Sequence, residues 1–166
     1  LPRMSEPLQA DWLRERLAAA SDVTRETGAA LVGGHTTQGA ELTLGFTATG
    51  TLKTAAKTLA RAQSGDILIV TRPIGSGTLM AAEMAGEAQG DDIASVLQAM
   101  ATAPVKTAEI LAQVAHSLTD ITGFGLGGHA ARMAFAAGLS AHIDSAAVPL
   151  YSGAETLAAN GIASTI

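Results

Sequence analysis

One stretch of the sequence places an acidic side chain, a histidine and four glycines within twelve residues. Residues 118–129 read LTDITGFGLGGH, and Asp120 comes three residues before Gly123. Three explanations are open. The stretch could be a dinucleotide-binding turn, a phosphate site assisted by a metal ion, or a plain connection from strand to helix. In the last case the glycines allow tight packing and Asp120 caps the helix.

The spacing of the glycines alone favours the dinucleotide explanation. Gly123, Gly125 and Gly128 fit G-x-G-x-x-G, and Asp144 follows near the place of a ribose-binding acid. The strand before such a turn should be apolar, however, and here it reads HSLTDIT. A bare carboxylate repels a pyrophosphate, whereas Mg²⁺ binds one or two carboxylates together with phosphate oxygens. Asp120 is therefore a candidate Mg²⁺ ligand.

A second glycine-rich stretch, LVGGHTT at residues 31–37, could approach a ligand with its backbone. A short apolar run ends at Gly33 and Gly34, and the side chains of His35, Thr36 and Thr37 add hydrogen-bonding groups. This arrangement suits adenine, ribose or phosphate, and the alternative is an ordinary turn at the end of a strand. No Walker A motif is present, so ATP would not bind through a P-loop.

Other chemistry has less support in the sequence. PIGSG at residues 73–77 predicts a structural turn in which Ser76 or Thr78 satisfies the helix donors. No two of the four histidines have a zinc-binding i,i+4 spacing on an expected helix, and His142 is expected to be structural. The chain has no cysteine, which excludes disulfides and a cysteine nucleophile within it.

Composition indicates a globular domain that does not bind nucleic acid. Hydrophobic residues make up 48% and charged residues 15% of 166 residues, which is typical of a folded core. The net charge is -5 and aromatic residues are 3%, which disfavours an RNA or single-strand binder. No apolar run reaches the ~18 residues of a membrane span, and the first residues show no signal region. We expect a cytoplasmic protein.

The elements that must position these residues are a mixture of helices and strands. The mixture predicts an α+β (mixed α/β) fold, with an internal boundary near residue 62 and domains at 1–62 and 63–166. Helices are expected at 9–28, 78–88, from Asp92 onward, 104–115, 125–138 and 151–161, with Gly28 and Gly138 as stops and Asp92 and Ser152 as caps. Strands are expected at 29–34, 42–49, 67–72, 116–122 and 139–144.

Four segments in this order resemble selenophosphate synthetase (selenide, water dikinase), of the aminoimidazole ribonucleotide synthetase superfamily. They are LVGGHTTQGAELTLGFTATG, GDILIVTRPIGSG, HSLTDITGFGLGGHAARMA and VPLYSGAETLAANGI, and the match extends over essentially the whole chain. The resemblance implies an ATP-dependent phosphotransferase that makes selenophosphate from selenide and releases AMP and phosphate, with Mg²⁺. By motif it implies ATP contacts at Gly33, Gly34, His35 and Thr36, and a Mg²⁺ ligand at Asp120.

The resemblance also implies a division of the chain. Residues 1–62 correspond to the end of an N-terminal ATP-binding domain, with a helix and two strands. Residues 63–166 correspond to a truncated C-terminal α/β domain. In the superfamily the N-terminal halves form a dimer, so a homodimer is expected through a part that this chain lacks.

The chain departs from the family pattern in two places. Nothing matches the family segment that carries a catalytic cysteine or selenocysteine and a lysine, so no catalytic residue is expected here and the fragment alone should be inactive. Gly127 stands where the family usually has leucine, which should loosen the start of that helix. Two alternatives remain, a non-catalytic scaffold or regulatory module of the same fold and a dinucleotide-binding domain.

Overall fold

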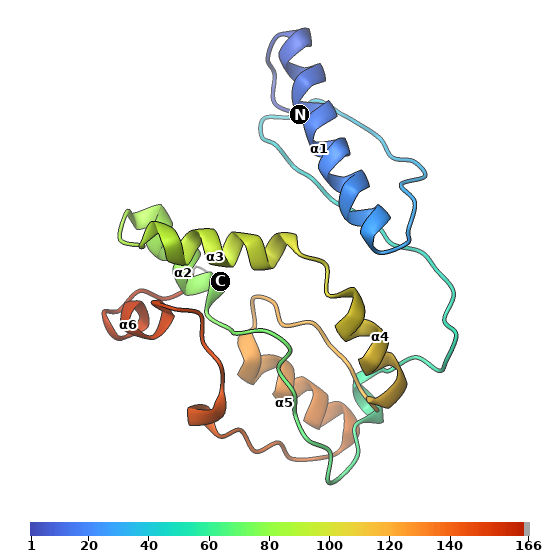
Figure 1. Cartoon of the computed structure of the whole chain (residues 1–166), viewed down its shortest axis with the longest axis vertical. Helices are drawn as coiled ribbons and strands as arrows, with labels where there is room; N and C mark the ends of the chain where they lie inside the picture. Colours follow the sequence, from blue (N-terminus) through green and yellow to red (C-terminus); the bar gives the residue numbers. More distant parts are fainter. Residues whose placement is uncertain (165–166) are drawn as a thin grey trace. The chain divides into compact units, whose positions relative to one another are not determined.

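The computed structural model describes residues 1–164, and its regular elements are helices joined by long non-helical segments (Figure 1). The chain divides into two compact units, Leu1–Lys53 and Thr54–Ile166, which we call unit 1 and unit 2. No helix in the described range is both long enough and apolar enough to cross a membrane. The elements are α1 (Glu6–Glu26), η1 (Leu59–Arg61), α2 (Ser76–Ala85), α3 (Gly90–Ala101), α4 (Val105–Val114), α5 (Gly125–Ala137), η2 (Ser145–Ala147) and α6 (Ala154–Ala159).

The helices lie close to where the sequence predicts them. α1 ends at Glu26 with Gly28 just beyond it, and α5 ends at Ala137 with Gly138 as its C-cap. Pro104, expected in the first turn of α4, occupies its N-cap, one residue before the helix begins at Val105. These boundaries depend on local signals, namely apolar periodicity and glycine or proline at the ends, and such signals are readable from sequence.

The side-chain caps predicted at three helix starts are wrong. α3 begins at Gly90, so Asp92 lies inside its first turn, where a carboxylate still favours the positive end of the helix. α2 and α6 have no side-chain cap, because a glycine with positive φ occupies the N-cap position of each helix. The predicted caps of those two helices are Ser76, Thr78 and Ser152.

The β part of the expected fold is not shown. Within residues 1–164 the backbone forms no paired strands, and only two isolated parallel bridges occur, Pro2 with Gly39 and Ile74 with Leu150. A strand needs the backbone of a neighbouring strand as its hydrogen-bond partner, and alternation of side chains alone does not supply one. The segments concerned are 29–34, 42–49, 67–72, 116–122 and 139–144.

The best-packed part of unit 2 joins α2, α3 and α6. Leu79 and Val96 are fully buried there, and Ile93 and Ala154 complete the cluster. The bridge at Ile74 brings α2 and α6 together, since its N–H donates to the Pro149 carbonyl at 2.9 Å and its carbonyl accepts from the Tyr151 N–H at 3.0 Å. Together the cluster and the bridge hold α2, α3 and α6 against one another.

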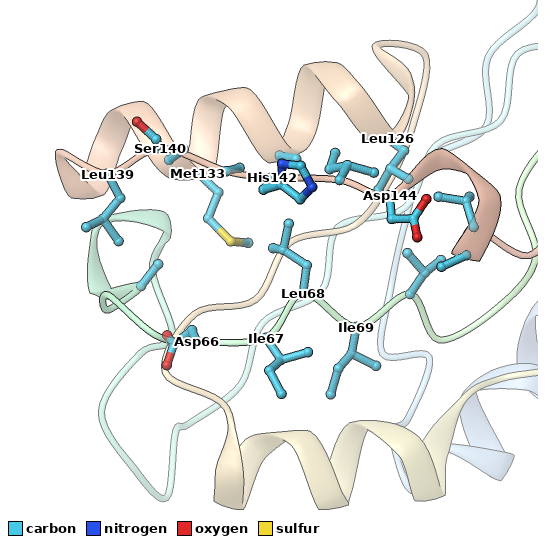
Figure 2. Close-up of a pocket in the computed structure, with 18 of the residues that line it drawn as sticks. Asp66, Ile67, Leu68, Ile69, Leu126, Met133, Leu139, Ser140, His142 and Asp144 are labelled. Carbon is cyan, nitrogen blue, oxygen red and sulfur yellow. The ribbon is translucent and has the colours of Figure 1, made fainter.

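A second group of elements surrounds the non-helical segment 67–70. Leu68 points to the α5 side of this segment, and Ile67 and Ile69 point to the opposite side (Figure 2). Such alternation is what an extended backbone produces. α5 also lies against η1, which precedes the segment in the chain. The segment therefore has the alternating side chains of an extended strand without the pairing of one, and Ile67, Leu68 and Ile69 are all exposed.

Candidate functional site

The four candidate ATP contacts lie on one continuous, exposed segment of unit 1, Gly33 to Thr36. A Cβ built on Gly33 or Gly34 would meet no atom within 4 Å, and neither glycine has a positive φ. The fold of unit 1 therefore gives no steric reason for glycine at these two positions. Close approach of a ligand to the backbone is a remaining physical reason.

The chain just after the candidate ATP contacts is held by hydrogen bonds to the first residues of unit 1. The Gly39 N–H donates to the Leu1 carbonyl at 2.8 Å, and Gln38 Nε2 donates to Gln9 Oε1 at 3.5 Å. Among the residues described, neither His35 nor Thr36 has a side-chain hydrogen bond. Both side chains are therefore available to a ligand.

Asp120 lies in unit 2, on the loop that leads into α5. Its side chain is exposed, and its carboxylate accepts no hydrogen bond from any residue that the structure describes. The N-cap of α5 is Phe124, without a side-chain cap, so the explanation of Asp120 as a helix cap is wrong. The structure leaves this carboxylate without a folding role.

The Asp120 carboxylate suits a Mg²⁺ site better than a structural zinc site. Residues 1–164 contain no group of three or more His, Cys, Asp or Glu side chains that could hold a metal ion by themselves. A structural zinc site needs four such ligands, whereas Mg²⁺ keeps several waters and binds through one or two carboxylates and substrate phosphates. Asp120 fits the second donor set, with phosphate and water as the other ligands.

The loop is anchored on the N-terminal side of Asp120. The Leu118 N–H donates to the Lys57 carbonyl at 3.0 Å. Two residues earlier, His116 Nδ1 lies 2.8 Å from Asp66 Oδ1, and both side chains are partly exposed. These contacts connect the start of the loop to the segment around η1, which precedes it by more than fifty residues.

Asp66 has a perturbed pKa because its carboxylate is hydrogen-bonded in its charged form. The backbone N–H of Gln63 donates to Asp66 Oδ2 at 2.9 Å, and this bond is the main cause that lowers the pKa of Asp66. The imidazole of His116 lowers it further. Hydrogen bonds to a charged carboxylate favour that form over the neutral acid.

The loop is anchored on the C-terminal side of Asp120 by His129, which is buried on α5. His129 Nε2 accepts the Thr122 N–H at 3.1 Å and lies 3.2 Å from Thr122 Oγ1. Sequence reasoning considered His129 only as a metal ligand and missed this contact. A signal was present, because side chains in the second turn of a helix point back toward its N-terminus.

Two glycines of this stretch have local explanations. Gly125 has φ 65°, which favours glycine, and a Cβ on Gly128 would lie 2.9 Å from Phe124 Cβ. The Phe124 ring in turn lies against His129, with 6.0 Å between ring centroids. Two of the three glycines in the G-x-G-x-x-G spacing, Gly125 and Gly128, are therefore explained by the turn before α5 and its packing, without a dinucleotide. Gly127 has neither feature.

Unit 2 also contains a largely apolar cavity of about 660 Å³ (Figure 2). Its walls come from residues 62–70, from α5 and from residues 139–149, with Asp66, His142 and Asp144 as titratable members. None of the predicted ATP contacts lines it, nor does Asp120, whereas Asp144, the candidate acid of the dinucleotide alternative, does. His142, expected to be structural, is exposed and lies in the wall of this cavity.

Two family models match the chain. AIR synthase related protein, N-terminal domain, matches residues 2–52, and AIR synthase related protein, C-terminal domain, matches residues 63–162. The second match alone covers more than half of the chain, and the resemblance noted from the sequence is confirmed. The chain belongs to the AIR synthase related family.

The curated relatives show a more specific similarity within this family. The "Selenide, water dikinase" of Geobacter metallireducens is 38% identical over 152 residues, which cover 90% of this chain and 44% of the relative. "Selenide, water dikinase 2" of Peptoclostridium acidaminophilum is 41% identical over 153 residues, with the same coverage. The chain thus spans less than half the length of these relatives. No solved structure matches the chain.

Proposed function

We propose that the protein containing this chain is an ATP-dependent phosphotransferase that makes selenophosphate. ATP, selenide and water would give selenophosphate, AMP and orthophosphate. Two phosphoanhydride bonds are broken, and one phosphorus–selenium bond and one phosphorus–oxygen bond form. The observation that carries the proposal is the similarity, over about 90% of the chain, to relatives named selenide, water dikinase.

The roles proposed for residues of this chain are in binding. Gly33 and Gly34 would let the backbone approach ATP, and His35 and Thr36 would contact the nucleotide with their side chains. Asp120 would hold Mg²⁺. When bound, Mg²⁺ neutralises charge on the phosphates, which is most of what phosphoryl transfer requires besides positioning. No catalytic side chain is assigned here, and we expect no activity from the chain alone.

We also propose a domain boundary near residue 62 and a homodimer in the intact protein. The unmatched interval between the two family models, residues 53–62, supports the boundary. The dimer rests on the family resemblance. Sedimentation of the intact protein at micromolar concentration would test it, and a monomer there would contradict it.

Asp120→Asn tests the metal role, because it removes the charge and keeps the size of the side chain. In the intact protein we expect selenide-dependent AMP formation to fall at least about 100-fold, since metal binding to phosphates provides several kcal/mol to the transition state. Asp91→Asn is the matched control, because Asp91 is an exposed carboxylate in the first turn of α3. An Asp120→Asn enzyme as active as the control would refute the role.

Gly34→Ala tests the ATP segment independently of the metal. The added methyl group meets no atom within 4 Å, so the thermal stability of the protein should not change. The KM for ATP should rise, because the methyl group would separate the ligand from the backbone. Gly45→Ala is the control, since Gly45 has equally open surroundings in unit 1. Equal KM values for the two variants would count against ATP binding at this segment.

A further inference from the structure

Asp120 lies midway between two fixed points of its loop. The Leu118 N–H is bonded to the Lys57 carbonyl at 3.0 Å, and the Thr122 N–H is bonded to His129 Nε2 at 3.1 Å. Each anchored residue is two positions from Asp120. Because so little chain separates the carboxylate from both anchors, its position depends on each of them.

The two anchors differ in kind. The Lys57 carbonyl is a backbone acceptor, which no substitution of a side chain removes. His129 is a side-chain acceptor, held on α5 with only 8% of its surface exposed and with its ring against Phe124. A backbone N–H can only donate, so Nε2 must present its lone pair and the ring proton of the neutral imidazole lies on Nδ1. The Thr122 hydroxyl, 3.2 Å from the same nitrogen, is a second possible donor.

We propose that His129 is a positioning residue for the binding of the metal ion by Asp120. Its imidazole acts through the backbone of Thr122 and keeps the loop in the conformation that presents the carboxylate. The inference rests on the proposed function, because it takes Asp120 as a ligand of Mg²⁺. Residues that orient metal ligands without touching the metal contribute about 10- to 100-fold to metal affinity in other sites.

The test is a titration of the intact protein with the complex of Mn²⁺ and ATP, followed by the relaxation rate of water protons, which rises when the protein binds the Mn²⁺. His129→Phe keeps an aromatic ring against Phe124 and removes the acceptor, and we expect it to weaken Mn²⁺ binding about 10-fold. His129→Gln places an amide oxygen where Nε2 was, and we expect it to restore most of the affinity. His142→Phe is the matched control, because His142 is an exposed histidine of the same unit.

The outcomes separate the two proposals. If Asp120→Asn abolishes Mn²⁺ binding and His129→Phe leaves it at the level of the control, His129 is only a packing residue and the inference is wrong. If Asp120→Asn has no effect on Mn²⁺ binding, the proposed metal role fails and the inference fails with it. Failure of His129→Gln to recover affinity would also overturn the inference.

A measurement on the unsubstituted protein covers the case in which His129→Phe does not fold. Long-range ¹H–¹⁵N correlation spectra of the imidazole distinguish a protonated ring nitrogen from one that presents its lone pair. We expect His129 Nε2 to show the lone-pair signature at neutral pH, with the proton on Nδ1. A proton on Nε2 would exclude a hydrogen bond from the Thr122 N–H and overturn the inference without any variant.

Discussion

His116 and His129 lie on either side of Asp120 and have opposite hydrogen-bonding roles. The Asp66 carboxylate can only accept when ionised, so His116 Nδ1 donates to it across 2.8 Å. The Thr122 N–H can only donate, so His129 Nε2 accepts. One histidine therefore holds the beginning of the loop through a charged partner, and the other holds its end through a neutral one. Only the first contact depends on the ionisation of a carboxylate.

This dependence predicts how the His116 contact responds to pH. The pKa of Asp66 is lowered relative to 3.8, so its stabilising contribution is present above that value and is lost as pH falls through the lower pKa of the folded state. His116→Ala should raise the pKa of Asp66 only part of the way back toward 3.8, because the hydrogen bond from the backbone N–H of Gln63 remains and is the larger cause. The ¹³C chemical shift of the Asp66 carboxyl carbon, followed from pH 6 downward, measures the midpoint of the Asp66 titration in the unsubstituted protein and in the variant.

A matched control keeps this measurement specific. His142→Ala removes another exposed histidine of unit 2 and should leave the Asp66 midpoint unchanged. If His116→Ala and His142→Ala give the same midpoint as the unsubstituted protein, the contact between His116 and Asp66 does not persist in solution.

The start of α5 shapes the loop that carries Asp120. The structure requires glycine at one of two neighbouring positions there and not at the other. Gly128 leaves room for Phe124, whose ring contacts His129. Gly127, one residue earlier, has open surroundings and an ordinary backbone conformation. At Gly127 only helix propensity should determine how a substitution changes stability. At Gly128 the contact with Phe124 should determine it. A single-sequence pattern treats the two positions alike.

Alanine at these two positions should therefore have opposite effects on stability. Gly127→Ala should raise the free energy of unfolding by about 1 kcal/mol, the difference in helix propensity between glycine and alanine. Gly128→Ala should lower it by about 1–3 kcal/mol, since the new Cβ would lie 2.9 Å from Phe124 Cβ. Urea unfolding followed by circular dichroism gives both values. Equal stability of the two variants would contradict the packing of Phe124 against Gly128.

At the scale of elements, the sequence predicts the helix positions, because these depend on residues that are close in the chain. The positions of α1, α4 and α5 follow from apolar periodicity and from glycine or proline at their ends. The caps Asp92 and Ser152 could not be placed, because a shift of one or two residues in a helix start changes which side chain can cap it.

The contacts around Asp120 were beyond sequence reasoning for a different reason. Asp66 and His116 are fifty residues apart in the chain, and no periodicity links them. The family resemblance predicted a role for Asp120 from its place in the motif. It could not show which residues hold the loop. The metal and ATP roles of the predicted residues remain predictions, and the contacts of His129 were found only in the structure.

At the scale of the whole molecule, regular hydrogen bonding is confined to the helices of each unit. In unit 2 the buried cluster of Leu79, Ile93, Val96 and Ala154 ties α2, α3 and α6 together. The non-helical segments 67–70 and 141–143 are largely apolar, with His142 as the polar exception, yet their N–H groups donate to no backbone acceptor within the described part of the chain. Strand pairing is a non-local property, and alternation in one segment cannot supply its partner.

This distribution predicts an uneven pattern of amide hydrogen exchange in the chain. Amides of α2 and α3 exchange only when their helices open, whereas unbonded amides exchange almost as fast as in an unfolded peptide. The N–H groups of Ile67, Leu68 and Ile69 should therefore exchange at least about 100-fold faster than those of Leu79 and Val96. Residue-resolved NMR exchange at constant pH measures the ratio, with α1 as a helical reference in unit 1. Protection of Ile67–Ile69 as strong as that of Val96 would mean that this segment is paired in solution. That result would favour the strand predicted from its sequence over the unpaired backbone seen here, because only hydrogen bonding or deep burial slows exchange to that extent.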